Sequence, residues 1–174
     1  MASLAARASS TPGSGGSSSR AGTAWGSWGS SPRAGTAINE AMANASVIGS
    51  LTIPGRPEHV CAARSFAKKA LGEAGPVTDA AVLLVSETVT NAVLHSNSRR
   101  RGGTVSITII RVGGGTLIEV TDDGSQASAP VVKGHGCVSG GHGLFLVQTL
   151  ADQWGYVRDD DAATTVWFWL SGPA

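Results

Sequence analysis

The residues best suited to chemistry fall in three short stretches, each next to an apolar run. These stretches contain Glu87 and Asn91, Asp122 and Gly124, and Gly141, Gly143 and Leu144. A carboxylate such as that of Glu87 can take a proton from a hydroxyl group, and the amide oxygen of Asn91 is of the kind that Mg²⁺ binds. Glycines directly before a helix leave backbone N–H groups that bind phosphate. Each pattern also has a plain structural explanation, namely a solvated helix face, a turn or a helix cap.

The first stretch is expected to lie on a helix. The run from Asp79 to about Ser96 has Thr78 or Asp79 as a possible N-cap and repeats apolar residues at helical spacing. The apolar sector consists of Val82, Val85, Val89, Ala92 and Val93. At about 100° per residue, Glu87 and Asn91 lie close together and point away from that sector. The spacing therefore predicts one carboxylate and one amide on the same side of a buried helix.

Strands and further helices are expected around this helix. The expected strands cover residues 47–53, 104–112, 116–121, 154–157 and 164–170, and the other helices cover residues 57–71 and 144–152. Strict alternation of apolar residues indicates the strands, and Gly113-Gly114-Gly115 indicates a hairpin between two of them. This order of elements predicts an α+β two-layer sandwich, with a mixed, mostly antiparallel sheet and helices on one face.

Residues 1–45 form a separate segment of low complexity. Ser, Gly, Ala, Arg and Thr dominate it, and its large apolar side chains are those of Leu4, Trp25, Trp28 and Ile38. So few apolar groups cannot offset the entropy of ordering the segment, so we expect it to be disordered, with the folded domain at residues 46–172. An acid-poor, Arg- and Ser-rich start is also typical of an organelle transit peptide, and translation from Met42 would remove most of the segment.

Charge and cysteine content argue against several classes of protein. The chain has 13 basic and 12 acidic residues, and a net charge of +1 gives no reason to expect nucleic acid or a membrane as a partner. The two cysteines, Cys61 and Cys137, form no CxxC pair, which favours reduced thiols over a disulfide framework or a zinc site. Apolar runs such as residues 80–85 are too short to cross a bilayer. We therefore expect a cytoplasmic protein.

Four motifs together resemble those of the GHKL ATPases, the group that includes gyrase, heat-shock protein 90, histidine kinases and mismatch-repair proteins. Residues 86–95 resemble the N-box, residues 120–124 the G1 box with its Asp-x-Gly core, residues 141–144 the G2 box, and residues 164–170 the terminal Thr-containing strand. The motifs follow one another in the family's order, with the expected elements between them. The resemblance implies the Bergerat-type ATP-binding fold, with ATP and Mg²⁺ as cofactors.

The resemblance also implies how adenine is held. Asp122 is expected to accept a hydrogen bond from the exocyclic amine of adenine, a donor that is costly to bury without a partner. Gly124 is expected to let the backbone approach the adenine ring, since it has no side chain. The hydroxyl of Thr165 is expected to bond to adenine directly or through water.

The remaining site residues are expected at the phosphates. By resemblance, Asn91 supplies an oxygen to Mg²⁺, and Glu87 acts as general base toward the attacking hydroxyl of a protein serine or toward water. The residues expected at the phosphate-binding loop and helix start are Gly141, Gly143 and Leu144.

Within the superfamily, the short chain and residues 143–155 resemble the small anti-sigma-factor serine/threonine kinases of bacteria. This implies an ATP-binding regulatory protein that phosphorylates an anti-sigma antagonist, binds a sigma factor and forms a homodimer. The alternative is a non-catalytic ATP-binding module that sequesters a sigma factor or another partner. Glu87 favours the kinase, whereas Gln126 and Phe145, which stand where larger relatives often have glycine, leave the alternative open. The sequence does not name the sigma factor or the antagonist.

Overall fold

The computed structural model describes residues 45–72, 74–125, 142–159 and 163–172, and these ranges form a five-stranded sheet and three α-helices. The strands are β1 (Ser46–Pro54), β2 (Thr104–Val112), β3 (Gly115–Asp122), β4 (Gln153–Arg158) and β5 (Thr164–Ser171). The α-helices are α3 (Val60–Leu71), α4 (Pro76–His95) and α5 (His142–Leu150), and two single turns of 3₁₀-helix are η2 (Pro57–His59) and η3 (Asn97–Arg99). Except for Ala45, the segment predicted to be disordered lies outside the described residues.

The strands lie in the order β1-β2-β3-β5-β4, and every described pairing is antiparallel. The predicted sheet was mixed, so this part of the prediction is corrected. The reason is topological: β4 runs in the same direction as β3, but β5 lies between them and pairs with both. Two hairpins, β2–β3 and β4–β5, account for two of the four neighbouring pairs, and the other two pairs, β1–β2 and β3–β5, join strands separated by helices.

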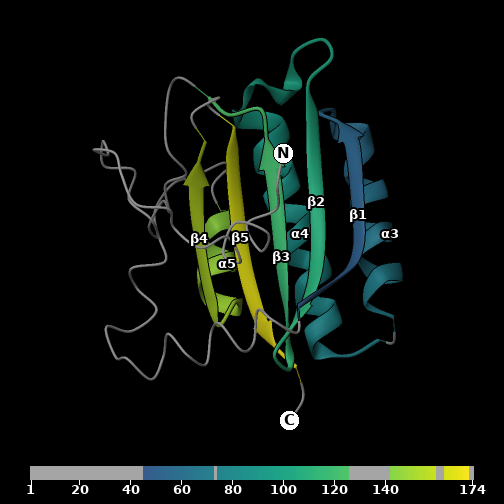
Figure 1. Cartoon of the computed structure of the whole chain (residues 1–174). Helices are drawn as coiled ribbons and strands as arrows, with labels where there is room; N and C mark the ends of the chain where they lie inside the picture. Colours follow the sequence, from purple (N-terminus) through teal and green to yellow (C-terminus); the bar gives the residue numbers. More distant parts are fainter. Residues whose placement is uncertain (1–44, 73, 126–141, 160–162, 173–174) are drawn as a thin grey trace, which may run out of the picture.

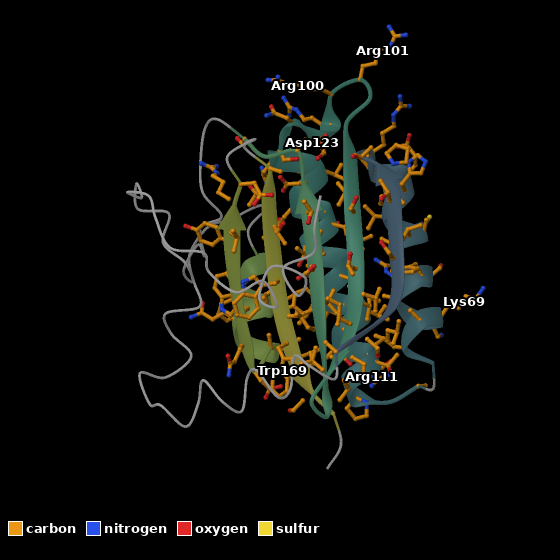
Figure 2. The ribbon with its side chains drawn as sticks, viewed as in Figure 1. Lys69, Arg100, Arg101, Arg111, Asp123 and Trp169 are labelled. Carbon is orange, nitrogen blue, oxygen red and sulfur yellow. The ribbon has the colours of Figure 1, made fainter. Side chains whose placement is uncertain are left out.

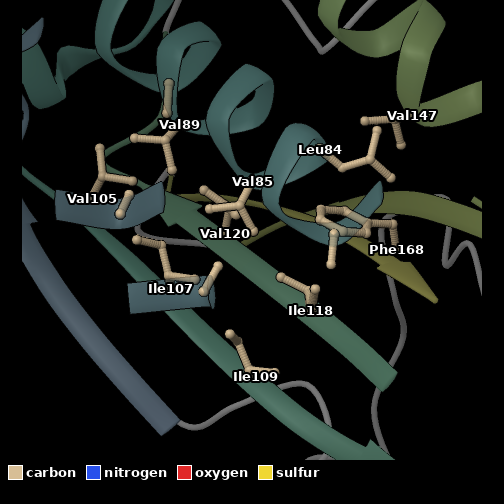
Figure 3. Close-up of a cluster of buried hydrophobic side chains, with 14 of the residues drawn as sticks. Leu84, Val85, Val89, Val105, Ile107, Ile109, Ile118, Val120, Val147 and Phe168 are labelled. Atoms are coloured by element: carbon tan, nitrogen blue, oxygen red, sulfur yellow. The ribbon is translucent and has the colours of Figure 1, made fainter. Parts of the chain in front are cut away.

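The molecule has two layers, because all three α-helices cover the same face of the sheet (Figure 1). The α+β sandwich predicted from the order of elements is confirmed. In the core between the layers, Val85 and Val89 of α4 face strand residues such as Val105 and Val120 (Figure 3). Leu84 of α4 lies beside Phe168 of β5 and close to Val147 of α5 in the same view. We call this face of the sheet the inner face and the opposite one the outer face.

Helix α4 is the central helix of the fold. It begins at Pro76, earlier than the predicted caps, because proline is well tolerated at the first helical position. Its 20 residues are long and apolar enough to cross a membrane, contrary to the expectation drawn from the shorter apolar runs, but 50% of its most apolar window is buried inside the fold. Packing of Val85, Val89 and Val93 against the sheet makes it the core helix of a soluble α+β domain.

Candidate functional site

The turn that follows β3 is shaped around the side chain of Asp122. The backbone N–H of Gly124 donates to Asp122 Oδ1 at 2.6 Å, and Gly124 has a φ of 67°, a left-handed conformation that glycine adopts without strain. Asp122 is half-buried, and its desolvation raises the pKa of the carboxyl to about 6, although the hydrogen bond from Gly124 opposes this rise. A carboxyl group is therefore held at the end of a central strand, in surroundings that disfavour its charged form.

The segment after α4 is joined to this turn by a set of hydrogen bonds. The N–H of Asn97 donates to the carbonyl oxygen of Gly124 at 2.7 Å. The N–H of Asp123 donates to Ser98 Oγ at 2.9 Å, and Ser98 Oγ donates to the carbonyl oxygen of Thr104 at 2.6 Å. The N–H of Thr104 donates in turn to Asp123 Oδ2 at 2.9 Å. The C-terminal end of α4 is thus fixed directly beside the turn that carries Asp122.

Close backbone packing reinforces the same junction. Ser98 is buried, and a Cβ atom added to Gly55 or Gly103 would lie 2.1 Å or 2.3 Å from the carbonyl oxygen of Ser98. No larger residue fits at either position without a shift of the backbone. Sequence reasoning did not identify Ser98 as part of the site, since a serine in a polar turn carries no recognisable signal.

The pairing of β2 with β3 shows how far along the fold Asn91 lies relative to Asp122. Val105 of β2 pairs with Asp122 of β3, and Figure 3 shows Val89 of α4 close to Val105. Asn91, half-buried, follows Val89 by two residues, so it lies near the level at which β3 ends. Asn91 is also seven residues after Leu84 and therefore points to the same side of α4, the side on which α5 packs. The structure thus brings the N-box amide and the G1 aspartate to the same end of the fold.

Glu87 lies one turn before Asn91 and is also half-buried. Since Val85 and Val89 face the sheet, the helical period directs Glu87 away from it, between the exposed side chains of Leu83 and Leu94. The predicted placement of the acid and the amide on one side of α4 is confirmed. The side chains of Leu83 and Leu94 are 41% and 50% exposed.

The two threonines at the start of β5 lie on opposite faces of the sheet. Thr165 pairs with Thr121, and their hydroxyl oxygens are 2.9 Å apart on the outer face. Thr164 pairs with Asp122 and shares the inner face with Phe168, four residues further along β5. Thr165, the threonine predicted to bind adenine, therefore lies on the face opposite Asp122, and Thr164 is the threonine that shares the face of Asp122. The sequence cannot show which of two adjacent threonines points to the site until it is known which face of the sheet each side chain is on.

Helix α5 directs its N-terminus toward the same end of the fold. It ends at Leu150, and Asp152 is bound at the opposite end of the sheet, where its N–H donates to the carbonyl oxygen of Trp169 at 3.1 Å. A helix of this length spans about 13 Å, so its first turn lies toward the end of β3 (Figure 1). Gly143 and Leu144 are in that first turn, whereas Gly141 and Gln126 lie outside the described residues.

Basic residues also gather at this end of the molecule. Arg158 Nη2 donates to the carbonyl oxygen of Ser125 at 2.9 Å, and its charge partly lowers the pKa of the Asp122 carboxyl. Arg100 and Arg101 project from the loop before β2, near Asp123 (Figure 2). A pocket of about 380 Å³ lies at the end of β1 and is lined by residues that include Arg56 and Arg100. None of the predicted site residues lines this pocket.

The described residues fit a magnesium site that depends on the nucleotide. They contain no group of three or more His, Cys, Asp or Glu side chains that could hold a metal by themselves. Mg²⁺ usually takes one or two protein oxygens together with water and phosphate oxygens. The half-buried amide of Asn91, on the α5 side of α4, provides such an oxygen.

The raised pKa of Asp122 has a measurable effect on stability. Folding raises the pKa of the Asp122 carboxyl from 3.8 to about 6, so the folded state binds this proton more tightly than the unfolded state does. The resulting stabilisation is fully present below pH 3.8 and is lost as the pH rises through 6. We therefore expect Asp122→Asn to increase the free energy of unfolding of the ligand-free protein by roughly 2 kcal/mol at pH 7.5 and by much less near pH 4. Urea unfolding at several pH values measures this, with Asp79→Asn, at an exposed position, as the control. An equal effect of Asp122→Asn at both pH values would contradict the assignment.

Comparison with known proteins indicates the family to which this domain is similar. A family model described as a histidine kinase-like ATPase domain matches residues 53–170. The match begins in β1 and ends in β5, so it spans all the motifs on which the site was built. A comparison with curated proteins finds no match.

Proposed function

The chain belongs to the histidine kinase-like ATPase domain family, and on this premise we propose that it is a serine/threonine protein kinase of the anti-sigma-factor type. The family supports an ATP-binding regulatory function. The further proposal is that the protein phosphorylates an anti-sigma antagonist and otherwise holds a sigma factor, as a cytoplasmic homodimer. The observation that carries it is the hydrogen-bonded junction between the end of α4 and the turn after β3, which places Asn91 and Asp122 at one end of the fold.

Adenine recognition is assigned to the inner-face end of β3 and β5. The Asp122 carboxylate accepts a hydrogen bond from the exocyclic amine, and Gly124 leaves space for the ring. Burial of Asp122 strengthens the recognition of adenine, because a desolvated carboxylate gains more from a buried N–H donor than a hydrated carboxylate does. Thr164, buried beside Asp122 in the strand register, supplies the hydroxyl.

Phosphoryl transfer is assigned to α4. Glu87 takes the proton of the substrate serine hydroxyl while that oxygen bonds to the γ-phosphorus and ADP leaves with the electrons of the broken phosphorus–oxygen bond. Asn91, one turn later, would hold Mg²⁺ through its amide oxygen. The metal, when bound, neutralises charge on the phosphate oxygens. The first turn of α5, with Gly143 and Leu144, binds phosphate through backbone N–H groups.

The proposal is tested by transfer of label from radioactive ATP. The purified protein is incubated with Mg²⁺ and, one at a time, with anti-sigma antagonist proteins from the same organism. We expect one antagonist to gain label on serine or threonine, and chelation of Mg²⁺ to prevent it. If no antagonist is labelled although a fluorescent ATP analogue binds with Mg²⁺, the kinase proposal is wrong.

One observation favours the alternative function, a non-catalytic ATP-binding module that sequesters its partner. Phe145, half-buried in the first half of α5, stands where larger relatives often have a glycine of the phosphate loop. A large side chain there alters the segment that encloses the phosphates, and turnover depends on that enclosure. Under this alternative, ATP still strengthens partner binding, and Phe145→Gly does not produce label transfer.

The two threonines of β5 provide a matched pair of variants. We expect Thr164→Val to weaken binding of the ATP analogue roughly fivefold, since a hydrogen bond of about 1 kcal/mol is lost. Thr165→Val is expected to leave the affinity unchanged within twofold, because its hydroxyl contacts Thr121 on the outer face. Fluorescence titration of both variants measures the difference. The opposite ranking would restore the role first assigned to Thr165.

A further inference from the structure

The outer face of the sheet carries a second apolar cluster. It consists of Ile110, Val112, Leu117 and Trp167, which we call the outer-face cluster, and Val157 and Trp169 pack against it. The three α-helices all lie on the inner face (Figure 1), and no described helix or strand covers the cluster. This inference does not depend on the proposed function.

An antiparallel sheet with one face in water alternates apolar and polar residues, and its solvated face is polar. The outer face follows that rule near β1, where Thr52 Oγ1 and Ser106 Oγ are 2.8 Å apart, and at the end of β3 and β5 that carries Thr121 and Thr165. Toward the other end of β3 and β5 it is apolar instead, with Leu117 paired with Trp169. The polar and apolar parts of the outer face are therefore separate. A short polypeptide segment is large enough to cover the apolar part.

The chain itself leads to the cluster. Ala45 packs against the outer-face cluster, and β1 begins next to it, with Ser46 opposite Arg111 of β2. The 44 residues before Ala45 thus join the fold at the edge of the apolar area. We propose that the N-terminal segment, residues 1–44, docks on the outer-face cluster, with the indole rings of Trp25 and Trp28 as its anchors.

The length of the N-terminal segment and its covalent connection to the fold favour it as the occupant of the outer face. The stretch from Trp28 to Ala45 can extend to about 55 Å. Five strands at a spacing of about 4.8 Å span only about 20 Å. A tethered segment has an effective local concentration in the millimolar range, so two aromatic anchors suffice where a free peptide would bind weakly. Its many Gly and Ser residues then act as flexible spacers around the anchors.

Limited trypsin digestion of the full chain, followed by mass spectrometry, tests the proposal. Trypsin can cut after Arg20 and Arg33, on either side of the two tryptophans. We expect the double variant Trp25→Ala/Trp28→Ala to be cut at these sites at least tenfold faster than the wild type. The matched control Thr23→Ala/Ser30→Ala, in the same segment, should be cut at the wild-type rate. The substitutions lie outside the folded domain, so binding of the ATP analogue should stay unchanged in both.

Equal cleavage rates in the tryptophan variant and the wild type would overturn the proposal. A second copy of the chain is then the competing cover. It is detected by light scattering as a dimer that Trp169→Arg dissociates and that Trp25→Ala/Trp28→Ala does not. Conversely, a wild type that is protected at Arg20 and Arg33, and that loses this protection in the tryptophan variant with no change in oligomeric state, supports docking of the segment.

Discussion

Glu87→Gln is expected to lower the rate of phosphoryl transfer to the antagonist by 10²- to 10⁴-fold, the usual contribution of a general base. The glutamine side chain has nearly the same shape, so ATP affinity should stay within about twofold. The physical reason is that the amide cannot accept the proton that leaves the serine hydroxyl. Single-turnover label transfer at saturating ATP measures the chemical step separately from binding.

The control for this substitution is Glu58→Gln. Glu58 is an exposed glutamate in η2 whose oxygen lies 3.9 Å from Arg56, a contact of little energetic weight at the surface. Its replacement should leave transfer unchanged. If Glu87→Gln transfers phosphate at the normal rate, Glu87 is not the base, although Asn91 and Asp122 can still form the nucleotide site.

Asn91→Ala is expected to abolish nucleotide binding that depends on Mg²⁺, with an affinity loss of more than 100-fold when Mg²⁺ is present. The metal would lose the protein oxygen that connects it to α4. In the presence of a chelator, wild type and variant should bind the ATP analogue about equally weakly. The measurement is a fluorescence titration at several Mg²⁺ concentrations, and circular dichroism verifies that the variant is folded.

Asn97→Ala is the matched control for Asn91→Ala. Asn97 contacts the turn after β3 mainly through its backbone N–H, which alanine keeps, and its side chain makes only a 3.5 Å contact with the carbonyl oxygen of Asp123. Magnesium-dependent binding should survive this substitution. Retention of the full magnesium effect in Asn91→Ala would show that another oxygen holds the metal.

The order of elements and the helical side of Glu87 and Asn91 could be predicted because apolar periodicity is a local property. Strand alternation, together with the glycines at residues 113–115, likewise predicted the hairpin of β2 and β3. The sequence could not show that the sheet is antiparallel throughout, because that depends on β5 lying between β3 and β4. It also could not show which of Thr164 and Thr165 faces Asp122, since a shift of one residue exchanges the two faces of a strand.

The junction at Ser98 was beyond prediction for a different reason. The hydrogen bond from Asp123 to Ser98 joins residues 25 positions apart, and serine, asparagine and aspartate form such bonds in many turns. The raised pKa of Asp122 was equally hidden, because its largest cause is burial of the end of β3, which depends on the packing of distant elements. The predicted site residue Gly141 and the adjoining loop lie outside the described residues, so their roles stay predictions.

The link from Asn97 and Ser98 to the turn after β3 also bears on how tightly a nucleotide is held. Two segments to which the proposed function assigns opposite ends of the nucleotide are joined by hydrogen bonds within the polypeptide itself. Their mutual ordering is thus completed when the domain folds, and a binding event does not have to supply it. Under the proposed function the site is consequently preorganised, and the ligand-free protein should already show slow hydrogen exchange at the amides of Asn97 and Asp123.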